Sequence, residues 1–315
     1  MQFRTELTAE RADFSITHQT PIFAVGSCFA ENIGERLNHS SIPILTNPYG
    51  IVYQVVAIQK IFSDIANHKK YEAKDLDIYN ELWFSFTHHS KFSNTNQAAC
   101  LAEINKNLAT AQAHLAKTEF IFITLGTAQV FIHKEKNYFV NNCHKLPATN
   151  FTKTRMSVSE VVGSLHATII DVRSVAPNAK FIFTVSPVRY LREGLIQSQR
   201  SKAILLLAIE NICQTINGCH YFPAYEYLLD DLRDYRFYDT DMLHPSAEAV
   251  DYIYQKFSET YFDADTQRIS TQIEKIKRAQ AHRPAHTAIA EYARFSTQLQ
   301  ADIDLFNTQN PTIKL

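Results

Sequence analysis

The sequence predicts an α/β fold in which helices cover both faces of a parallel β-sheet. Three short apolar runs, at residues 22–25, 120–125 and 181–185, are rich in Phe, Ile and Val and indicate buried strands. Each run ends at small or turn-forming residues, and helical patterns lie between the runs. Strands that alternate with helices pair in parallel, and such sheets are covered on both faces.

The segments between the strands justify the individual helices. Phe29, Ile33 and Leu37 recur every four residues, which is the spacing of one helix face, in a helix that opens just after Ser27. Residues 101–115 and 157–174 also have helical patterns. Residues 202–216 predict a strongly apolar helix that lies against the sheet, and a further short strand is expected near residues 220–222.

Other parts of the chain fit this alternation less well. We interpret residues 69–100 and 133–157 as loops inserted to cap the site, because long loops on an α/β scaffold usually carry function. From about residue 265 the composition becomes polar and helical, with an interruption at Arg283-Pro284 and a second helix from Ala285 to about Leu305. We therefore predict a domain of residues 1–262 and a helical extension of residues 263–315, which packs on the domain or on another subunit.

The composition favours a small or neutral ligand. The formal net charge is −1, so no overall field attracts nucleic acid or an anionic membrane. The N-terminus lacks the apolar run of a secretory signal, and no stretch approaches the roughly 18 apolar residues that span a bilayer. We therefore expect a cytoplasmic protein. Five cysteines without CxxC spacing predict reduced thiols and no zinc site.

Ser27 is the first candidate catalytic residue. Gly26 permits a tight turn, and a helix that begins at Ser27 or the next residue aims free backbone N–H groups at whatever binds there. Such donors stabilise the oxyanion that forms in acyl transfer. The alternative is that Ser27 only caps the helix, which is the preferred role of serine at a helix start.

Asp241 and His244 form the second candidate pair. A serine hydroxyl needs a base of near-neutral pKa, and histidine supplies one when a carboxylate orients its other nitrogen. The three-residue spacing lets both side chains lie on one side of a tight turn, and Pro245 suits the first turn of a following helix. The motif alone is a weak signal, so its value is its position at the end of the core domain.

Other residues have alternative interpretations. Cys28 shares the helix start, where a thiol pKa is lowered, but the residue after a nucleophile turns into the helix. His144 is expected to line the pocket or hold a loop. Arg189 either clamps an anionic substrate group or pairs with an Asp. His88 and His89 lack acidic partners at metal spacing, so we predict no metal site.

Residues 26–30 read Gly-Ser-Cys-Phe-Ala, the signature that names the GSCFA family, which is related to the SGNH/GDSL hydrolases. The resemblance covers residues 1 to about 260. Further segments resemble family motifs in family order: Asn47-Pro48-Tyr49-Gly50, Thr124-Leu125-Gly126-Thr127, Asn142-Cys143-His144-Lys145, Ser186-Pro187-Val188-Arg189, Ser201-Lys202, Asp234-Tyr235-Arg236-Phe237-Tyr238, and Asp241 with His244-Pro245.

The resemblance implies a three-layer α/β/α sandwich with a flavodoxin-like parallel sheet. It also implies Ser27 as nucleophile, His244 as general base and Asp241 as the partner of His244. Related GDSL enzymes remove acyl groups from carbohydrates or lipids, so an O-acetylated sugar is the substrate suggested by analogy.

Two departures from the GDSL pattern concern the oxyanion hole. GDSL enzymes carry Asp directly before the nucleophile, where this chain has Gly26, and Gly-x-Asn in the third block, where it has Gly126-Thr127-Ala128. The asparagine that helps to bind the oxyanion is therefore missing. The candidates that replace it are the N–H groups of Ser27 and Gly50, the hydroxyl or N–H of Thr127, and the Asn47 amide.

These observations together predict a serine esterase or deacylase that acts on a small-molecule or carbohydrate ester. No metal or organic cofactor is needed for this chemistry, and neither nucleic acid nor membrane is an expected partner. The alternatives are an acyltransferase that uses the same triad, and a non-catalytic carbohydrate- or metabolite-binding module on the same fold. We expect any oligomer to form through the C-terminal helices.

Overall fold

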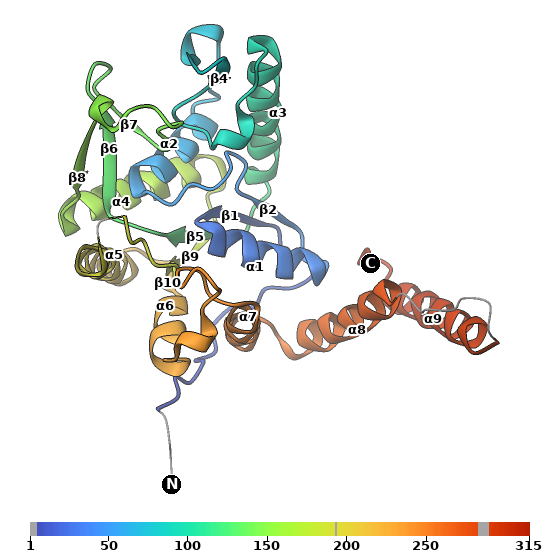
Figure 1. Cartoon of the computed structure of the whole chain (residues 1–315). Helices are drawn as coiled ribbons and strands as arrows, with labels where there is room; N and C mark the ends of the chain where they lie inside the picture. Colours follow the sequence, from blue (N-terminus) through green and yellow to red (C-terminus); the bar gives the residue numbers. More distant parts are fainter. Residues whose placement is uncertain (1–4, 193, 283–289) are drawn as a thin grey trace.

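The centre of the protein is a five-stranded parallel sheet (Figure 1). The computed structural model describes residues 5–192, 194–282 and 290–315. Neighbouring strands follow the order β2-β1-β5-β9-β10, and every neighbouring pair is parallel. When the five strands of this sheet alone are renumbered 1 to 5 in chain order, the order becomes 2-1-3-4-5. This is the order of flavodoxin-like sheets, which confirms the predicted fold class. The strands are β1 (Ile22–Gly26), β2 (Ile44–Thr46), β5 (Phe120–Leu125), β9 (Lys180–Val185) and β10 (Cys219–Tyr221).

Helices cover both faces of this sheet, and their apolar faces form two separate cores. Along β5, Ile121 and Ile123 belong to one core, whereas Phe120 and Phe122 belong to the other. Both faces of the strand are thus buried, which is why its sequence is a continuous apolar run. The first face carries α2 (Val55–Ala66), α3 (Gln97–Leu115), α4 (Val158–Val175) and α5 (Leu195–Thr215), and the second carries α1 (Cys28–His39), α6 (Ala224–Glu226) and α7 (Ala247–Tyr261).

The two segments predicted as capping loops, residues 69–100 and 133–157, contain regular structure, which in the second case begins before the predicted segment, at residue 129. β3 (Asp77–Tyr79) and β4 (Leu82–Phe84) form a hairpin, and β6 (Gln129–His133), β7 (Tyr138–Val140) and β8 (Phe151–Arg155) form a three-stranded antiparallel sheet. A small apolar core of Phe84, Phe86, Val140 and Phe151 lies within these segments. We call residues 77–92 and 129–155 the cap, which lies at the top of Figure 1.

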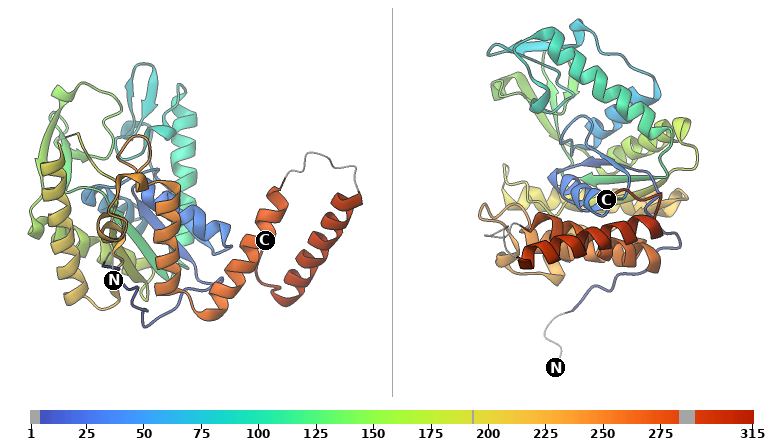
Figure 2. Two further views of the ribbon diagram at one scale, coloured as in Figure 1. Left: turned by 60° about the horizontal axis from the view of Figure 1, so that its bottom comes forward. Right: turned by 90° about the vertical axis from the view of Figure 1, so that its right-hand side faces the viewer.

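The C-terminal extension is a pair of helices, α8 (Ala264–Ala281) and α9 (Ala290–Gln309). They pack together through Ile273, Ile276 and Phe306, and they project sideways from the sheet (Figures 1 and 2). Lys277 ties α8 to the end of α1, because its Nζ donates to the carbonyl oxygen of His39. The predicted interruption at Arg283-Pro284 and the predicted helix start at Ala285 lie outside the described residues.

Candidate active site

Gly26 brings the end of β1 unusually close to β5. Its φ is +152°, and a Cβ at this position would lie 2.4 Å from the backbone oxygen of Thr124. A side chain is therefore excluded for two reasons, the backbone conformation and the missing space. The turn places Ser27 at the carboxyl edge of the sheet beside the β1–β5 junction. At this junction the strand order reverses, and open α/β sheets bind their ligands at such a point.

Replacing Gly26 by alanine is expected to destabilise the fold by about 2–5 kcal/mol, from backbone strain and overpacking together. The midpoint of thermal unfolding, followed by circular dichroism, should fall by roughly 5–15 °C. Gly163→Ala is the matched control, because Gly163 lies within α4 and has no heavy atom within 4 Å of its would-be Cβ. That variant should be as stable as the wild type or slightly more stable. Equal midpoints for the two variants would contradict this account of Gly26.

Ser27 both caps α1 and takes part in a buried hydrogen-bond chain. Its Oγ accepts from the N–H of Phe29 at 3.2 Å and donates to Oγ of Ser186 at 2.9 Å. Ser27 is 5% exposed, and Ser186, directly after β9, is fully buried. Ser27 therefore has the capping role that the sequence offers as the alternative to catalysis. Capping does not exclude nucleophilic attack, because the hydroxyl proton remains available for transfer.

Ser186 leads to a lysine that sequence reasoning did not place in the site. The carbonyl oxygen of Ser186 accepts from Nζ of Lys202 at 2.7 Å, and Lys202 is 2% exposed. Burial lowers the pKa of Lys202 to about 7. A signal was present in the sequence: Lys202 precedes Leu205 and Ile209 by three and seven residues, so it belongs to the buried face of its helix.

Asp241 and His244 are held together as their spacing predicts. Oδ2 of Asp241 lies 2.6 Å from Nδ1 of His244, and Oδ1 accepts from the N–H groups of Leu243 and His244 at 2.8 and 3.0 Å. These donors, the backbone N–H of His244 first, lower the pKa of Asp241 to about 2. The carboxylate is therefore ionised at neutral pH. In a neutral ring, Nδ1–H then faces the carboxylate and Nε2 is the proton acceptor.

Ser27 and His244 approach the same edge of the sheet from different elements. Across the described residues, no hydrogen bond joins their side chains: the Ser27 hydroxyl donates to Ser186, and the His244 ring is bonded to Asp241. The loop of His244 is fixed to the segment after β9, where the N–H of Arg189 donates to the carbonyl oxygen of Leu243 at 3.0 Å. Both groups are thus anchored within three residues of each other on one segment, Ser27 at Ser186 and the His244 loop at Arg189.

Asn47 is the oxyanion-hole candidate whose donor is still available. Its φ is +46°, and its Oδ1 accepts from the N–H of Gly26 at 2.9 Å. Its Nδ2 is buried and, within the described part of the chain, has no hydrogen-bond partner. A buried donor without an acceptor is costly, so an incoming oxygen atom would be a favourable partner.

Three of the groups expected to replace the GDSL asparagine already form hydrogen bonds: the N–H groups of Gly50 and Ser27, and the hydroxyl of Thr127. The N–H of Gly50 donates to the carbonyl oxygen of Asn47 at 2.8 Å, and that of Ser27 donates to Thr124 at 3.3 Å. Oγ1 of Thr127 lies 2.9 Å from Oγ of Ser201 and accepts from the N–H of Gln129. Gly50 and Thr127 therefore have structural roles in this conformation, and we leave both out of the oxyanion hole proposed below.

The remaining candidates lie around this edge rather than next to Ser27. Gly126 lets Tyr53 pack against the end of β5, because a Cβ there would lie 2.8 Å from the Tyr53 Cβ. His144 bonds to the carbonyl oxygen of Ser85 at 2.9 Å, and burial lowers its pKa to about 4, so it stays neutral and holds the cap. The Arg189 guanidinium lies 4.0 Å from the ring centroid of Tyr238, an aromatic contact that the sequence did not predict.

Cys28 is a poor alternative nucleophile. Its position at a helix start predicted a lowered thiol pKa, but burial outweighs the helix N-terminus and raises the pKa of Cys28 instead. The thiol therefore stays protonated at neutral pH, where a thiolate would be needed for attack.

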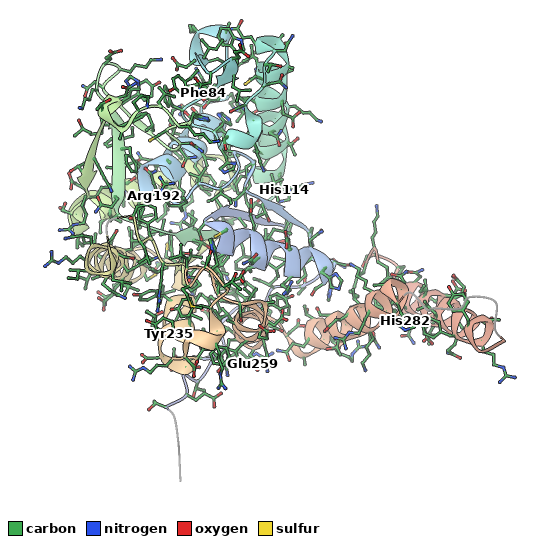
Figure 3. All side chains as sticks on the ribbon, viewed as in Figure 1. Phe84, His114, Arg192, Tyr235, Glu259 and His282 are labelled. Atoms are coloured by element: carbon green, nitrogen blue, oxygen red, sulfur yellow. The ribbon has the colours of Figure 1, made fainter. Side chains whose placement is uncertain are left out.

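A cavity of about 1030 Å³ lies between the cap and the loops that follow β2 and β9. Tyr53 and Gln54 line it from the first loop, and Tyr190 and Arg192 from the second. Its walls do not include Ser27, but the first loop is bonded to the nucleophile turn, because the N–H of Val52 donates to the carbonyl oxygen of Gly26 at 3.1 Å. Two wall residues are labelled in Figure 3, where Phe84 lies higher in the view than Arg192.

The described ranges contain no group of three or more His, Cys, Asp or Glu side chains placed to hold a metal ion. His88 is instead buried and stacks on Tyr49, with ring centroids 4.1 Å apart. None of the helices seen in these ranges has the length and apolar character required to cross a membrane.

Comparison with known proteins gives two family matches. The model of the GSCFA family matches residues 21–257, and that of the GSCFA domain protein, C-terminal domain, matches residues 273–315. No curated protein matches the chain.

Several solved structures resemble the chain at low identity. One from Streptococcus pneumonia, provisionally described as a platelet activating factor, has a TM-score of 0.40 at 17% identity and covers 76% of this chain and 83% of its own. The structure of a carbohydrate esterase family 3 protein from Talaromyces cellulolyticus has a TM-score of 0.38 at 7% identity. The match covers 82% of this chain and 99% of that protein. The structure of an acetyl esterase variant with acetate ion has a TM-score of 0.36 at 8% identity. The match covers 82% of this chain and 100% of that protein. At TM-scores this low, nothing about the function of this chain follows from them.

Proposed function

The chain belongs to the GSCFA family, and from this premise we propose that it is a serine esterase or deacylase that cleaves an O-acyl ester through Ser27, His244 and Asp241. The bond between Asp241 and the ring of His244 carries the proposal, because it orients a proton acceptor at the edge of the sheet where a serine begins a helix. Orienting a histidine in this way is the role of the carboxylate in serine hydrolases.

The reaction has two halves. Oγ of Ser27 attacks the ester carbonyl carbon while Nε2 of His244 takes the hydroxyl proton, and the carbonyl oxygen becomes an oxyanion. Collapse of this intermediate breaks the bond to the alcohol, which leaves with the proton from His244. Water then attacks the acyl-enzyme, again with His244 as base, and releases the acid and free Ser27. The first step requires the Ser27 hydroxyl to turn from Ser186 toward His244, a rearrangement compatible with the looser hydrogen bonds of substrate-free enzymes.

Asn47 is the donor that we propose for the oxyanion. Its buried Nδ2 has no partner among the described residues, while its Oδ1 binds the N–H of Gly26 directly before the nucleophile. The N-terminal end of α1, next to Ser27, adds the positive end of a helix dipole. These two features replace the asparagine that GDSL enzymes carry in a different block.

Replacing Asn47 by aspartate is expected to lower kcat for a short-chain ester by about 10²–10³-fold with little change in KM. The variant keeps the acceptor for Gly26 N–H and the tolerance for positive φ, but it loses the Nδ2 donor. Steady-state kinetics measures the effect, and circular dichroism checks the fold. Asn105→Asp is the control, because Asn105 lies on α3 outside the cavity and its Oδ1 likewise accepts from a backbone N–H, that of Tyr71. Equal losses in the two variants would remove Asn47 from the oxyanion hole.

The cavity supports a carbohydrate ester as the substrate. It combines the aromatic rings of Tyr53, Tyr190 and Phe84 with the amides of Asn141 and Asn142. Aromatic faces pack on the apolar faces of sugar rings, and amides bind hydroxyl groups. Its volume lies near the upper end of the range for ligand pockets, which suits more than one sugar unit.

Trapping the acyl-enzyme tests the proposed function. The protein is mixed with p-nitrophenyl acetate, quenched in acid and digested, and mass spectrometry locates the acetyl group. The expected result is an acetyl group on the peptide that contains residues 26–30, assigned to Ser27 by fragmentation. Acetyl on Cys28, or none above background, would overturn the proposal. Faster turnover on addition of an alcohol acceptor would assign a transferase that uses the same residues.

A further inference from the structure

Lys202 is a charged side chain in an apolar position. It lies on the face of α5 that also presents Leu205 and Ile209 to the core, and it is 2% exposed. An apolar side chain of similar length would fill this position without any loss of hydration, whereas a buried ammonium carries a large desolvation cost. A lysine here is therefore not explained by packing.

The charge of Lys202 is not neutralised by an acid. Of all the residues that the structure describes, none provides a carboxylate that forms an ion pair with Lys202. Among the described residues, Nζ forms one hydrogen bond, the 2.7 Å contact to the carbonyl oxygen of Ser186. The ring centroid of Tyr225 lies 5.8 Å away, and Cys28 is the other ionisable group near the ammonium. The site therefore holds a positive charge without its counter-charge.

Ser186 connects this charge to the nucleophile. Its hydroxyl accepts from Oγ of Ser27 at 2.9 Å, while its carbonyl oxygen accepts from Lys202. The neighbouring residue on α5 makes a parallel connection: Oγ of Ser201 accepts from the N–H of Ala128 at 2.6 Å, just after β5. Consecutive residues of α5 thus fix the segments that follow β5 and β9.

We propose that Lys202 is a positioning residue for Ser27: its ammonium fixes Ser186, the hydrogen-bond partner of the nucleophile, and supplies the positive charge that balances the negative charge developing at Ser27 during acylation. This role rests on the proposed function of Ser27. This charge would also compensate for the missing GDSL asparagine, which binds the oxyanion in GDSL enzymes. A cation in a low-dielectric site stabilises an oxyanion even without direct contact.

The test is the acylation rate of Ser27 by a fluorophosphonate probe, measured across pH in the full-length protein. Lys202 is charged below its pKa of about 7, so its contribution is present there and is lost as pH rises through that value. Burial raises the pKa values of Cys28 and Tyr225, the ionisable groups that face it from α1 and α6, so neither titrates first. We expect a fall in the wild-type rate above about pH 7.

Lys202→Met should lower the rate below that pH by roughly 10–100-fold and should remove the fall above it. Its thermal midpoint should equal or exceed that of the wild type, because an apolar residue replaces a buried charge. Lys256→Met is the matched control. Lys256 of α7 is also buried, but unlike Lys202 it forms ion pairs, with Glu6 near the N-terminus and with Glu259 of the same helix. That variant should lose stability and keep the wild-type pH profile.

A folded Lys202→Met protein with the wild-type rate and profile would overturn the role of Lys202. If that variant does not fold, the wild-type profile decides, since a rate that does not fall above neutral pH contradicts the inference by itself. In Ser186→Ala the fall with pH should be retained, because Lys202 binds the carbonyl oxygen of residue 186 and not its side chain. Labelling of Ser27→Ala at the wild-type rate would instead refute the proposed function, whereas labelling confined to Ser27 leaves it standing.

Discussion

The Ser27→Ala protein is expected to hydrolyse short-chain p-nitrophenyl esters at least about 10³-fold more slowly than the wild type, with a loss of up to about 10⁶-fold in kcat. The reason is that no acyl-enzyme forms without Oγ of Ser27. The variant can then accelerate direct attack by water only through substrate binding and electrostatic stabilisation of the oxyanion. The rate of p-nitrophenolate release measures the effect, and background hydrolysis in buffer sets its floor.

The same substitution also removes the N-cap of α1, because Oγ accepts from Phe29 N–H. Ser157→Ala separates the two effects, since Ser157 caps α4 in a capping box with Glu160, and none of its contacts involves the residues assigned to the site. Each variant should lose about 1 kcal/mol of stability, and only Ser27→Ala should lose activity. If Ser157→Ala loses as much activity as Ser27→Ala, the capping interpretation of Ser27 is sufficient.

His244→Ala should lose activity to a similar degree, and Asp241→Asn should lower kcat by about 10⁴-fold, because an amide favours the wrong tautomer of the ring. The pKa of Asp241 is lowered to about 2, so its carboxylate stays ionised throughout the pH range of an esterase assay. Titration of Asp241 itself should therefore contribute nothing to any pH dependence of this drop within that range.

Asp239→Asn is the control for the loop. Asp239 accepts from the N–H of Thr240 at 2.7 Å and has no contact with the ring of His244, although its backbone N–H donates to the His244 carbonyl oxygen. That variant should retain wild-type kcat. A loss equal to that of Asp241→Asn would show that the loop, rather than the carboxylate on the ring, is what matters.

The central strands could be predicted because each is buried on both faces and therefore forms an apolar run. Predicted residues 22–25 and 181–185 lie within one residue of β1 and β9, and β5 has the predicted bounds. The edge strand β2 was not predicted, since its three residues are only half-buried and give no such run. The helix α2 was missed as well, although seven of its twelve residues are buried.

The site could be predicted only where its geometry is local. The Asp241–His244 bond spans three residues, and the Ser27 cap spans two, so spacing and residue type suffice. The engagement of Gly50 N–H also lies within one turn, but it depends on the φ of Asn47, which composition does not reveal. The contact between Ser27 and Ser186 joins residues 159 positions apart, and no pattern along the chain encodes it.

The cap has a small apolar core of its own, although its residues Phe92 and Val130 belong to a core of the sheet. Cap side chains that line the cavity and lie outside the sheet cores can therefore be exchanged while the packing that holds Ser27 and Lys202 stays intact. If the proposed function holds, specificity and catalysis are separable, and relatives with the same sheet can differ in the ester they accept through mutations confined to the cap. For an engineer, the cap is the region to randomise, and the sheet edge is the region to leave alone.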